Sequence, residues 1–186
     1  MDLPPFPRLK WDEYQWVGEA VLPAWAGFQE RLGPYTELSS EDASDGTTCL
    51  GVNVPDQERP TPPSAEQAAA IRYLLERGDA VRDAILAADF RDYQVWRGNK
   101  TSARMDGTMP EIDRPDELRT LIGVGTVYVL AAVRDGAAYV GFEFGCNWDE
   151  EHGFGVLTHR DRVVAVDDAE TAWNEALAAE DARRGE

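Results

Sequence analysis

The chain has 186 residues, so we expect one domain over 1–186, with a core that needs no disulfide or metal to hold it together. Eighteen Lys and Arg against 35 Asp and Glu give a formal net charge of -17, which repels phosphate backbones and anionic lipids and attracts basic surfaces. This charge argues against nucleic-acid binding and against membrane-surface binding.

The two cysteines, Cys49 and Cys146, are far apart and lie outside any C-x-x-C pattern. Neither a disulfide framework nor a zinc ribbon is indicated. No stretch approaches the roughly 20 apolar residues of a membrane span, and the first residues lack the apolar run of a signal peptide. We therefore expect a cytoplasmic protein.

The first third of the chain predicts strands separated by turns. β-Branched and aromatic residues favour strands at 14–21 and 24–30, which Pro23 separates because proline cannot donate to a strand ladder. Residues 33–46 are polar and rich in turn formers, which indicates an exposed loop before a third strand at 47–54.

Two helices are predicted in the middle of the chain. Ser64 and Gln67 have the spacing of a capping box, in which each side chain satisfies a backbone group at the start of a helix. Gly78 gives a stop signal and Asp79 a new N-cap, after which a second apolar stripe runs to about Trp96. The pair is predicted to form an αα-hairpin.

The C-terminal half predicts a β-meander after a second exposed loop at 97–115. Strands at 124–133 and 137–146 flank Asp135-Gly136, which is a strong hairpin signal. A further hairpin over 154–158 and 163–166 and a helix over 169–183 complete the elements. Together they predict an α+β fold, in which an antiparallel sheet built as a meander packs against the αα-hairpin, with a C-terminal helix.

The most conspicuous polar motif is Asp149, Glu150, Glu151 and His152, in a loop between two predicted strands. Carboxylate with imidazole can bind Mn, Fe or Zn, and a carboxylate can act as a general base. A turn between strands uses the same residue types, however, and consecutive carboxylates point in different directions. The second histidine, His159, could complete a metal pair only if the two loops converge.

No complete catalytic motif is present elsewhere. The serines lack a glycine-flanked nucleophile elbow, and both cysteines lie in apolar predicted strands, where a thiol stays protonated. Gly123 and Gly125 precede a strand rather than open a helix, so they do not form a nucleotide-binding loop. We therefore assign no catalytic residue, metal ligand or cofactor.

Acidic residues beside an aromatic indicate a surface for a basic protein partner, because aromatic anchors rimmed with charge are typical of interfaces. The loop at 148–152 has this composition, and the loop at 41–45 adds further acidic residues to the same candidate surface. The candidate partner-binding residues are Glu41, Asp42, Asp45, Trp148, Asp149, Glu150, Glu151 and His152.

Two stretches resemble a family of uncharacterised bacterial domains of unknown function, found where secreted toxin systems are common. They are the segment from Trp11 to Phe28 and the segment Trp-Asp-Glu-Glu-His-Gly-Phe-Gly-Val at 148–156, continuing to Val164. The predicted helices after Pro63 are similar to the family's middle section. The resemblance implies a bacterial α+β domain and a link to immunity proteins, and it carries no catalytic residues.

These observations favour an acidic protein-binding protein, of the immunity type, that neutralises a bacterial toxin by covering a basic surface. The alternative is a small metal-dependent hydrolase that uses the acidic loop at 149–152, with residues 97–115 as a lid. Converging carboxylates would favour the enzyme, whereas carboxylates spread over a face would favour the binding protein.

Overall fold

The computed structural model describes residues 4–31, 38–98, 109–149 and 151–184. Its centre is a seven-stranded sheet in the order β1-β2-β5-β6-β7-β8-β9, beside a two-stranded sheet of β3 and β4. The seven strands are β1 Lys10–Trp11, β2 Gln15–Val21, β5 Thr47–Asn53, β6 Ile122–Arg134, β7 Ala137–Cys146, β8 Phe154–His159 and β9 Arg162–Asp167. The small sheet consists of β3 Gln29–Arg31 and β4 Leu38–Ala43.

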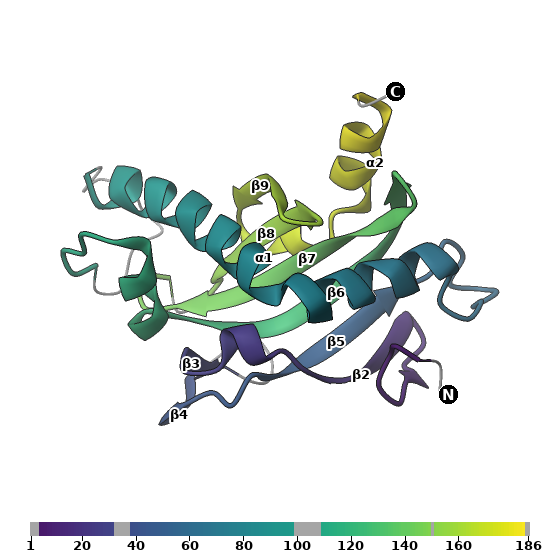
Figure 1. Cartoon of the computed structure of the whole chain (residues 1–186), viewed down its shortest axis with the longest axis horizontal. Coiled ribbons are helices and arrows are strands. Elements are labelled where there is room, and N and C mark those ends of the chain that lie inside the picture. The colour runs from purple at the N-terminus through teal and green to yellow at the C-terminus, as the bar shows by residue number, and fades with distance from the viewer. Residues whose placement is uncertain (1–3, 32–37, 99–108, 150, 185–186) are drawn as a thin grey trace.

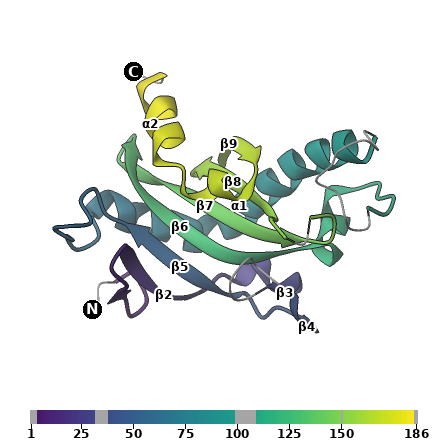
Figure 2. The same cartoon turned by 180° about the vertical axis from the view of Figure 1, so that it is seen from behind.

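The helices lie on opposite faces of the large sheet. Helix α1 (Ala65–Gly98) crosses one face along its length, and α2 (Glu175–Arg184) stands against the other face near the C-terminus (Figure 1, Figure 2). The described residues also form three short 3-10 helices: η1 Pro23–Trp25, η3 Pro115–Thr120 and η4 Ala169–Trp173.

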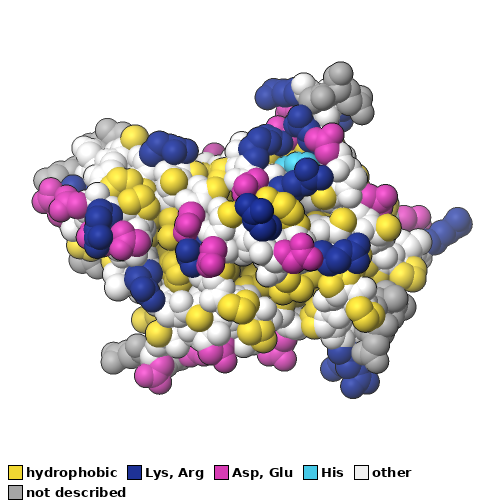
Figure 3. Space-filling model, viewed as in Figure 1, with side chains coloured by type: hydrophobic (Ala, Val, Ile, Leu, Met, Phe, Trp, Pro, Cys, Tyr) yellow, Lys and Arg dark blue, Asp and Glu magenta, His cyan; other side chains and the backbone are white. Residues whose placement is uncertain are grey.

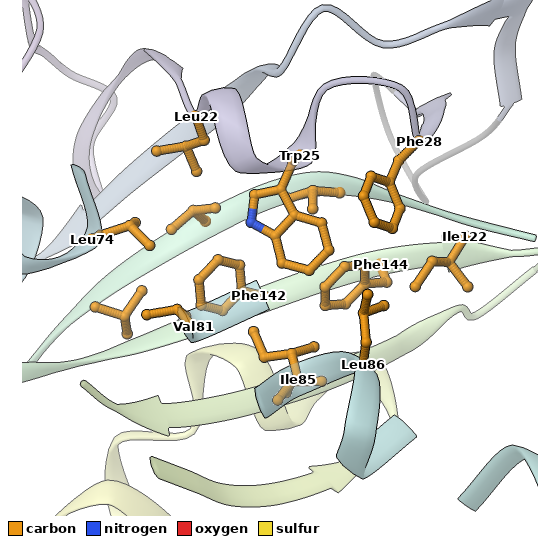
Figure 4. Close-up of a cluster of buried hydrophobic side chains, with 14 of the residues drawn as sticks. Leu22, Trp25, Phe28, Leu74, Val81, Ile85, Leu86, Ile122, Phe142 and Phe144 are labelled. Atoms are coloured by element: carbon orange, nitrogen blue, oxygen red, sulfur yellow. The ribbon is translucent and has the colours of Figure 1, made fainter. Parts of the chain in front are cut away.

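The predicted αα-hairpin is wrong. The two predicted helices form one long helix with a kink, and only Arg77 has a non-helical backbone (φ -124, ψ 22). One such residue bends a helix but cannot reverse the chain. Leu74 before the kink and Val81 and Ile85 after it are all buried in one core, so both halves rest on the same sheet face (Figure 4).

The predicted antiparallel meander is also wrong, because the sheet is mixed. Strand β5 pairs with β6 in parallel, with Leu50 opposite Val127, and every other neighbouring pair is antiparallel. A helical hairpin would have returned the chain to the end of the sheet where it left. The single helix α1 instead carries it from one end to the other, which is the connection that parallel neighbours need.

Several local predictions are confirmed. The capping box forms, since the Ser64 amide donates to Gln67 Oε1 at 2.9 Å and the Gln67 amide donates to Ser64 Oγ at 3.2 Å. The β6–β7 hairpin turns at Asp135 and Gly136, which both have positive φ (48 and 74), as a tight two-residue turn requires. The β8–β9 hairpin is present as well.

Other segments differ from the prediction. The expected strand at 24–30 is η1 followed by the short β3, and β4 lies inside the stretch 33–46 that was expected to be a loop. Residues 99–108 of the second expected loop lie outside the described residues, while Ile112 beyond them is buried in the core. The C-terminal helix begins only at Glu175, after η4.

The main core lies between α1 and the sheet and is rich in aromatic rings (Figure 4). Trp25 is at its centre, with ring centroids 5.0 Å from Phe28, 5.2 Å from Phe144 and 5.8 Å from Phe142. A smaller core on the opposite face joins α2 to the sheet. Its buried members are Leu130, Tyr139, Leu157 and Ala178.

Candidate functional site

The acidic loop after β7 is a compact turn that closes on itself. Asp149 is only 8% exposed, and its Oδ1 accepts a hydrogen bond from the His152 amide and contacts His152 Nδ1, both at 3.0 Å. The Gly153 amide donates to the Asp149 carbonyl at 3.0 Å. The Asp149 carboxylate therefore holds the turn together.

Trp148 fixes this turn to the core. Its ring packs 5.0 Å from Tyr93 and 5.7 Å from Phe154, and the residue is 3% exposed. The exposed members of the predicted set in this loop are Glu151 and His152, and Glu150 lies outside the described residues.

The two histidines do not approach each other. His152 precedes β8 and His159 ends it, which puts them roughly 20 Å apart at the rise of an extended strand. His159 is buried, with Nε2 2.8 Å from the Arg134 carbonyl and its ring 4.9 Å from Tyr139. Among the described residues, no group of three or more His, Cys, Asp or Glu side chains could hold a metal ion.

The two acidic stretches that the sequence singled out lie at the same end of the molecule. Gln29 of β3 pairs with Ala43 of β4, and its Nε2 also donates to Asn147 Oδ1 at 2.9 Å, just before the acidic loop. Asp42 and Asp45 are exposed. The side chain of Glu41 is outside the described part of the structure.

The sequence prediction missed a second polar site, on the sheet face opposite α1. Residues that directly neighbour each other across four strands form a straight row of side chains there, because register places them in line. The row runs from β2 to β7 through Glu19, Cys49, Thr126 and Glu143.

A parallel row beside it contains Val17, Gly51, Tyr128 and Gly141. Glu19 and Cys49 are exposed, and Thr126, Tyr128 and Glu143 are partly exposed, so solvent reaches both rows. We call this surface the open face. It consists of Glu19, Cys49, Thr126 and Glu143 of the first row, Val17, Gly51 and Tyr128 of the second row, and Gln15 and Asn53 of the next row. In Figure 2 this side of β5 and β6 lies toward the viewer, with α1 behind the sheet.

Glycines decide where this face is covered. A side chain at Gly141 would overlap the carbonyl oxygen of Ala172, and one at Gly155 would come within 2.6 Å of the Asp168 carbonyl oxygen. Because both positions lack a side chain, η4 lies directly on β7 and β8. Strand β3 lies in the same way on Gly123, so covering elements flank the open face on two sides.

Beside η4 the open face deepens into a pocket with a volume of ≈ 530 Å³. Trp173, at the end of η4, packs edge-on against Tyr128 with 5.3 Å between ring centroids. We call this the aromatic pocket. Its lining residues are Tyr14, Gln15, Asn53, Val54, Gln57, Tyr128, Trp173 and Glu175.

The electrostatics of the open face follow from partial burial. Burial raises the pKa of Glu143, although hydrogen bonds from the hydroxyls of Tyr128 and Thr126 oppose the rise. The Tyr128 hydroxyl donates to Glu143 Oε2 at 3.0 Å, and burial together with this carboxylate raises the pKa of Tyr128.

Cys49 lies between the two carboxylates of the row. Desolvation, followed by the negative charges of Glu19 and Glu143, raises the pKa of this thiol, so it stays protonated at neutral pH. A protonated thiol is a poor nucleophile. The chemistry available at the open face is therefore hydrogen bonding, aromatic contact and attraction of cations.

Fold and site together define a small α+β domain built on a mixed sheet, with one long helix on one face and an acidic, aromatic face opposite. The family model of DUF6985, a domain of unknown function, matches residues 29–173, so the chain belongs to this family. No curated protein and no solved structure matches the chain. Within the described residues, no helix is long and apolar enough to cross a membrane.

Proposed function

We propose that this protein is a binding protein whose open face takes up a basic segment of a partner protein. The observation that carries the proposal is the row Glu19, Cys49, Thr126 and Glu143, which places two carboxylates on the solvent-accessible open face. None of the residues of the open face or of the aromatic pocket is Lys or Arg. On the side that carries α1, by contrast, acidic and basic side chains are interspersed (Figure 3).

The overall charge supports the same class of partner. A net charge of -17 attracts a basic protein over a distance, and such steering raises the association rate more than the final affinity. The exposed acids Asp42, Asp45 and Glu151 lie at the β3 end of the molecule and would contribute to this steering.

A matched pair of charge reversals tests the proposal. Glu19→Lys changes the open face, and Glu76→Lys makes the same charge change at an exposed position of α1. With a fluorescent peptide of alternating Gly and Arg at ~0.15 M salt, we expect Glu19→Lys to weaken binding at least tenfold and Glu76→Lys less than twofold. Equal losses would show that only net charge matters and would overturn the assignment of the face.

A second comparison separates steering from contact. Reversing Asp42, Asp45 and Glu151 together should slow association and weaken its salt dependence, with little change in dissociation. Stopped-flow measurements at several salt concentrations would show this. If dissociation accelerates instead, these acids contact the partner directly.

Neutralisation of a toxin, as by an immunity protein, is the finer form of this proposal. Its support is the acid surplus, which suits a chain that covers the basic surface of a toxin acting on nucleic acid. Inhibition of such a toxin by the wild-type protein and its loss in Glu19→Lys would support it. Binding without inhibition would leave the protein as a binding module of another kind.

A further inference from the structure

The aromatic pocket has a rigid wall made by Trp173 and Tyr128. The backbone on both sides of Trp173 is fixed, because Ala172 before it lies against Gly141 and the Glu175 side chain after it is hydrogen-bonded to β6. Glu175 accepts hydrogen bonds from the Ala131 and Ala132 amides at 2.7 and 3.0 Å. The two rings, T-shaped at 5.3 Å, thus present a preorganised aromatic surface.

Two of the side chains that line the pocket, Gln15 and Tyr128, pack over a glycine of β5. An added side-chain carbon at Gly51 would lie 2.5 Å from Gln15 Oε1 and 3.1 Å from Tyr128 Cδ1. With no side chain at position 51, the Gln15 amide and the Tyr128 ring both pack over β5, and both line the pocket. The pocket volume of ≈ 530 Å³ is in the range of small-ligand sites.

The charge in and around the pocket is negative. Glu175 is part of the lining, and Glu143 stands behind the Tyr128 hydroxyl. Asn53 donates its Nδ2 to Glu175 Oε1 at 3.0 Å, which turns its amide oxygen away from that carboxylate and leaves it as an acceptor. Aromatic faces with carboxylates and amide oxygens, and with no basic residue in the lining, suit an organic cation.

We propose that the aromatic pocket binds the guanidinium group of an arginine in the partner segment. This inference rests on the proposed function and names the side chain that the open face recognises. A guanidinium is planar, stacks on the faces of Trp and Tyr, and donates in several directions to amide and carboxylate oxygens. A lysine ammonium is a more strongly hydrated point charge and uses such a surface less well.

The test compares three peptides of the form acetyl-Gly-Gly-X-Gly-Gly-amide, in which X is arginine, citrulline or lysine. Citrulline has nearly the shape of arginine without its charge. With the wild-type protein, we expect the arginine peptide to bind at least fivefold tighter than the citrulline peptide and to shift the Trp173 indole N–H signal in NMR spectra. Equal binding of arginine and citrulline would overturn the inference, and equal binding of lysine would overturn the preference for guanidinium.

Variants of the wall supply a second readout. Trp173→Ala should weaken binding of the arginine peptide at least fivefold, and Trp173→Phe should restore part of it, because a ring remains. If Glu19→Lys weakens the longer Gly-Arg peptide while neither the citrulline exchange nor Trp173→Ala has an effect, the pocket assignment fails and the binding face stands. If none of these changes has an effect, both fail.

Discussion

The Tyr128 hydroxyl donates a hydrogen bond to Glu143 Oε2 at 3.0 Å, joining β6 to β7 on the open face of the sheet. Burial raises the pKa of Glu143, and this hydrogen bond opposes the rise because it stabilises the charged carboxylate. The pair therefore keeps a partly buried negative charge on a surface that we propose meets a basic partner.

Tyr128→Phe should raise the pKa of Glu143 further, because the carboxylate loses a donor that favours its charged form. A pH titration of the Glu143 side-chain carboxyl carbon by NMR would measure the change. Tyr14→Phe is the control, because it also removes a hydroxyl from the aromatic pocket, and Tyr14 is 65% exposed. An unchanged Glu143 titration in Tyr128→Phe would contradict the assigned role of the hydroxyl.

Asp89→Asn should stabilise the protein at high pH. Asp89 is fully buried in α1, and neither of its carboxylate oxygens has a hydrogen-bond partner among the described residues. Burial, followed by the charge of Asp92, raises its pKa well above the ordinary value. The folded state thus holds this proton more tightly than the unfolded state, so the free energy of unfolding falls as pH rises above about 4.

An asparagine at position 89 cannot ionise, so the variant lacks this fall. We expect it to be more stable than the wild type at pH 8, by about 1–3 kcal/mol, and the difference to shrink toward pH 4. Urea unfolding at several pH values measures it. Asp113→Asn, at an exposed position, should leave the pH profile unchanged. A constant difference between Asp89→Asn and the wild type at all pH values would refute the explanation.

Asp181→Asn should destabilise the contact of α2 with the sheet. Its carboxylate accepts hydrogen bonds from Arg162, Tyr139 and Arg134, which hold the pKa of Asp181 well below its usual value. A lowered folded pKa gives stability that is present above about pH 4 and is lost as pH falls below it. We expect a loss of about 1–3 kcal/mol at pH 7 that narrows below pH 4.

The control for this variant is Glu180→Gln, on the same helix, whose carboxylate bonds only to the exposed Arg184 among the described residues. Hydrogen exchange of the amides of α2 should increase in Asp181→Asn and stay near the wild-type rate in Glu180→Gln. Equal exchange in the two variants would show that Asp181 does not hold α2 in place.

Gly141→Ala should displace η4. The added methyl group would overlap the Ala172 carbonyl, and overpacking of this kind costs about 1–3 kcal/mol or more. Thermal unfolding should occur at a lower temperature, and deuterium uptake at residues 169–173 should rise because η4 lifts from the sheet. Gly98→Ala is the control, since an added carbon there meets no atom of the described residues within 4 Å. A wild-type uptake pattern in Gly141→Ala would contradict this packing.

The strands and turns of the C-terminal half were predictable because their signals are local. Asp135 and Gly136 both adopt the positive φ that a two-residue hairpin turn needs, and the alternation along β7 places Phe142 and Phe144 in the core. The capping box of Ser64 and Gln67 is local in the same sense.

The kink at Arg77 shows where local signals fail. Gly78 and Asp79 together have the composition of a helix end, yet apolar residues on both sides of them can reach one sheet face if the helix only bends. Burial of a continuous apolar surface outweighs the weak preference of glycine for a helix end. The parallel direction of β6 relative to β5 follows from that one choice.

The candidate site illustrates the same limit. The acidic loop at 149–152 stands out in the sequence because its charges are consecutive. In the structure, however, Asp149 and the preceding Trp148 are buried and hold the turn in place. The row of Glu19, Cys49, Thr126 and Glu143 comes from four strands spread over the chain, so no sequence pattern marks it.

By itself, then, the sequence determined the acidic charge, the hairpins, the helix start and the alternation that places one face of each strand in the core, because these depend on residue type and on near neighbours. Only the tertiary structure decided that α1 is one helix, that β5 and β6 are parallel, and that two carboxylates and an aromatic pocket share a face. These depend on strand register and on where glycines admit η4 and β3 onto the sheet, and such contacts join residues that are far apart in the chain.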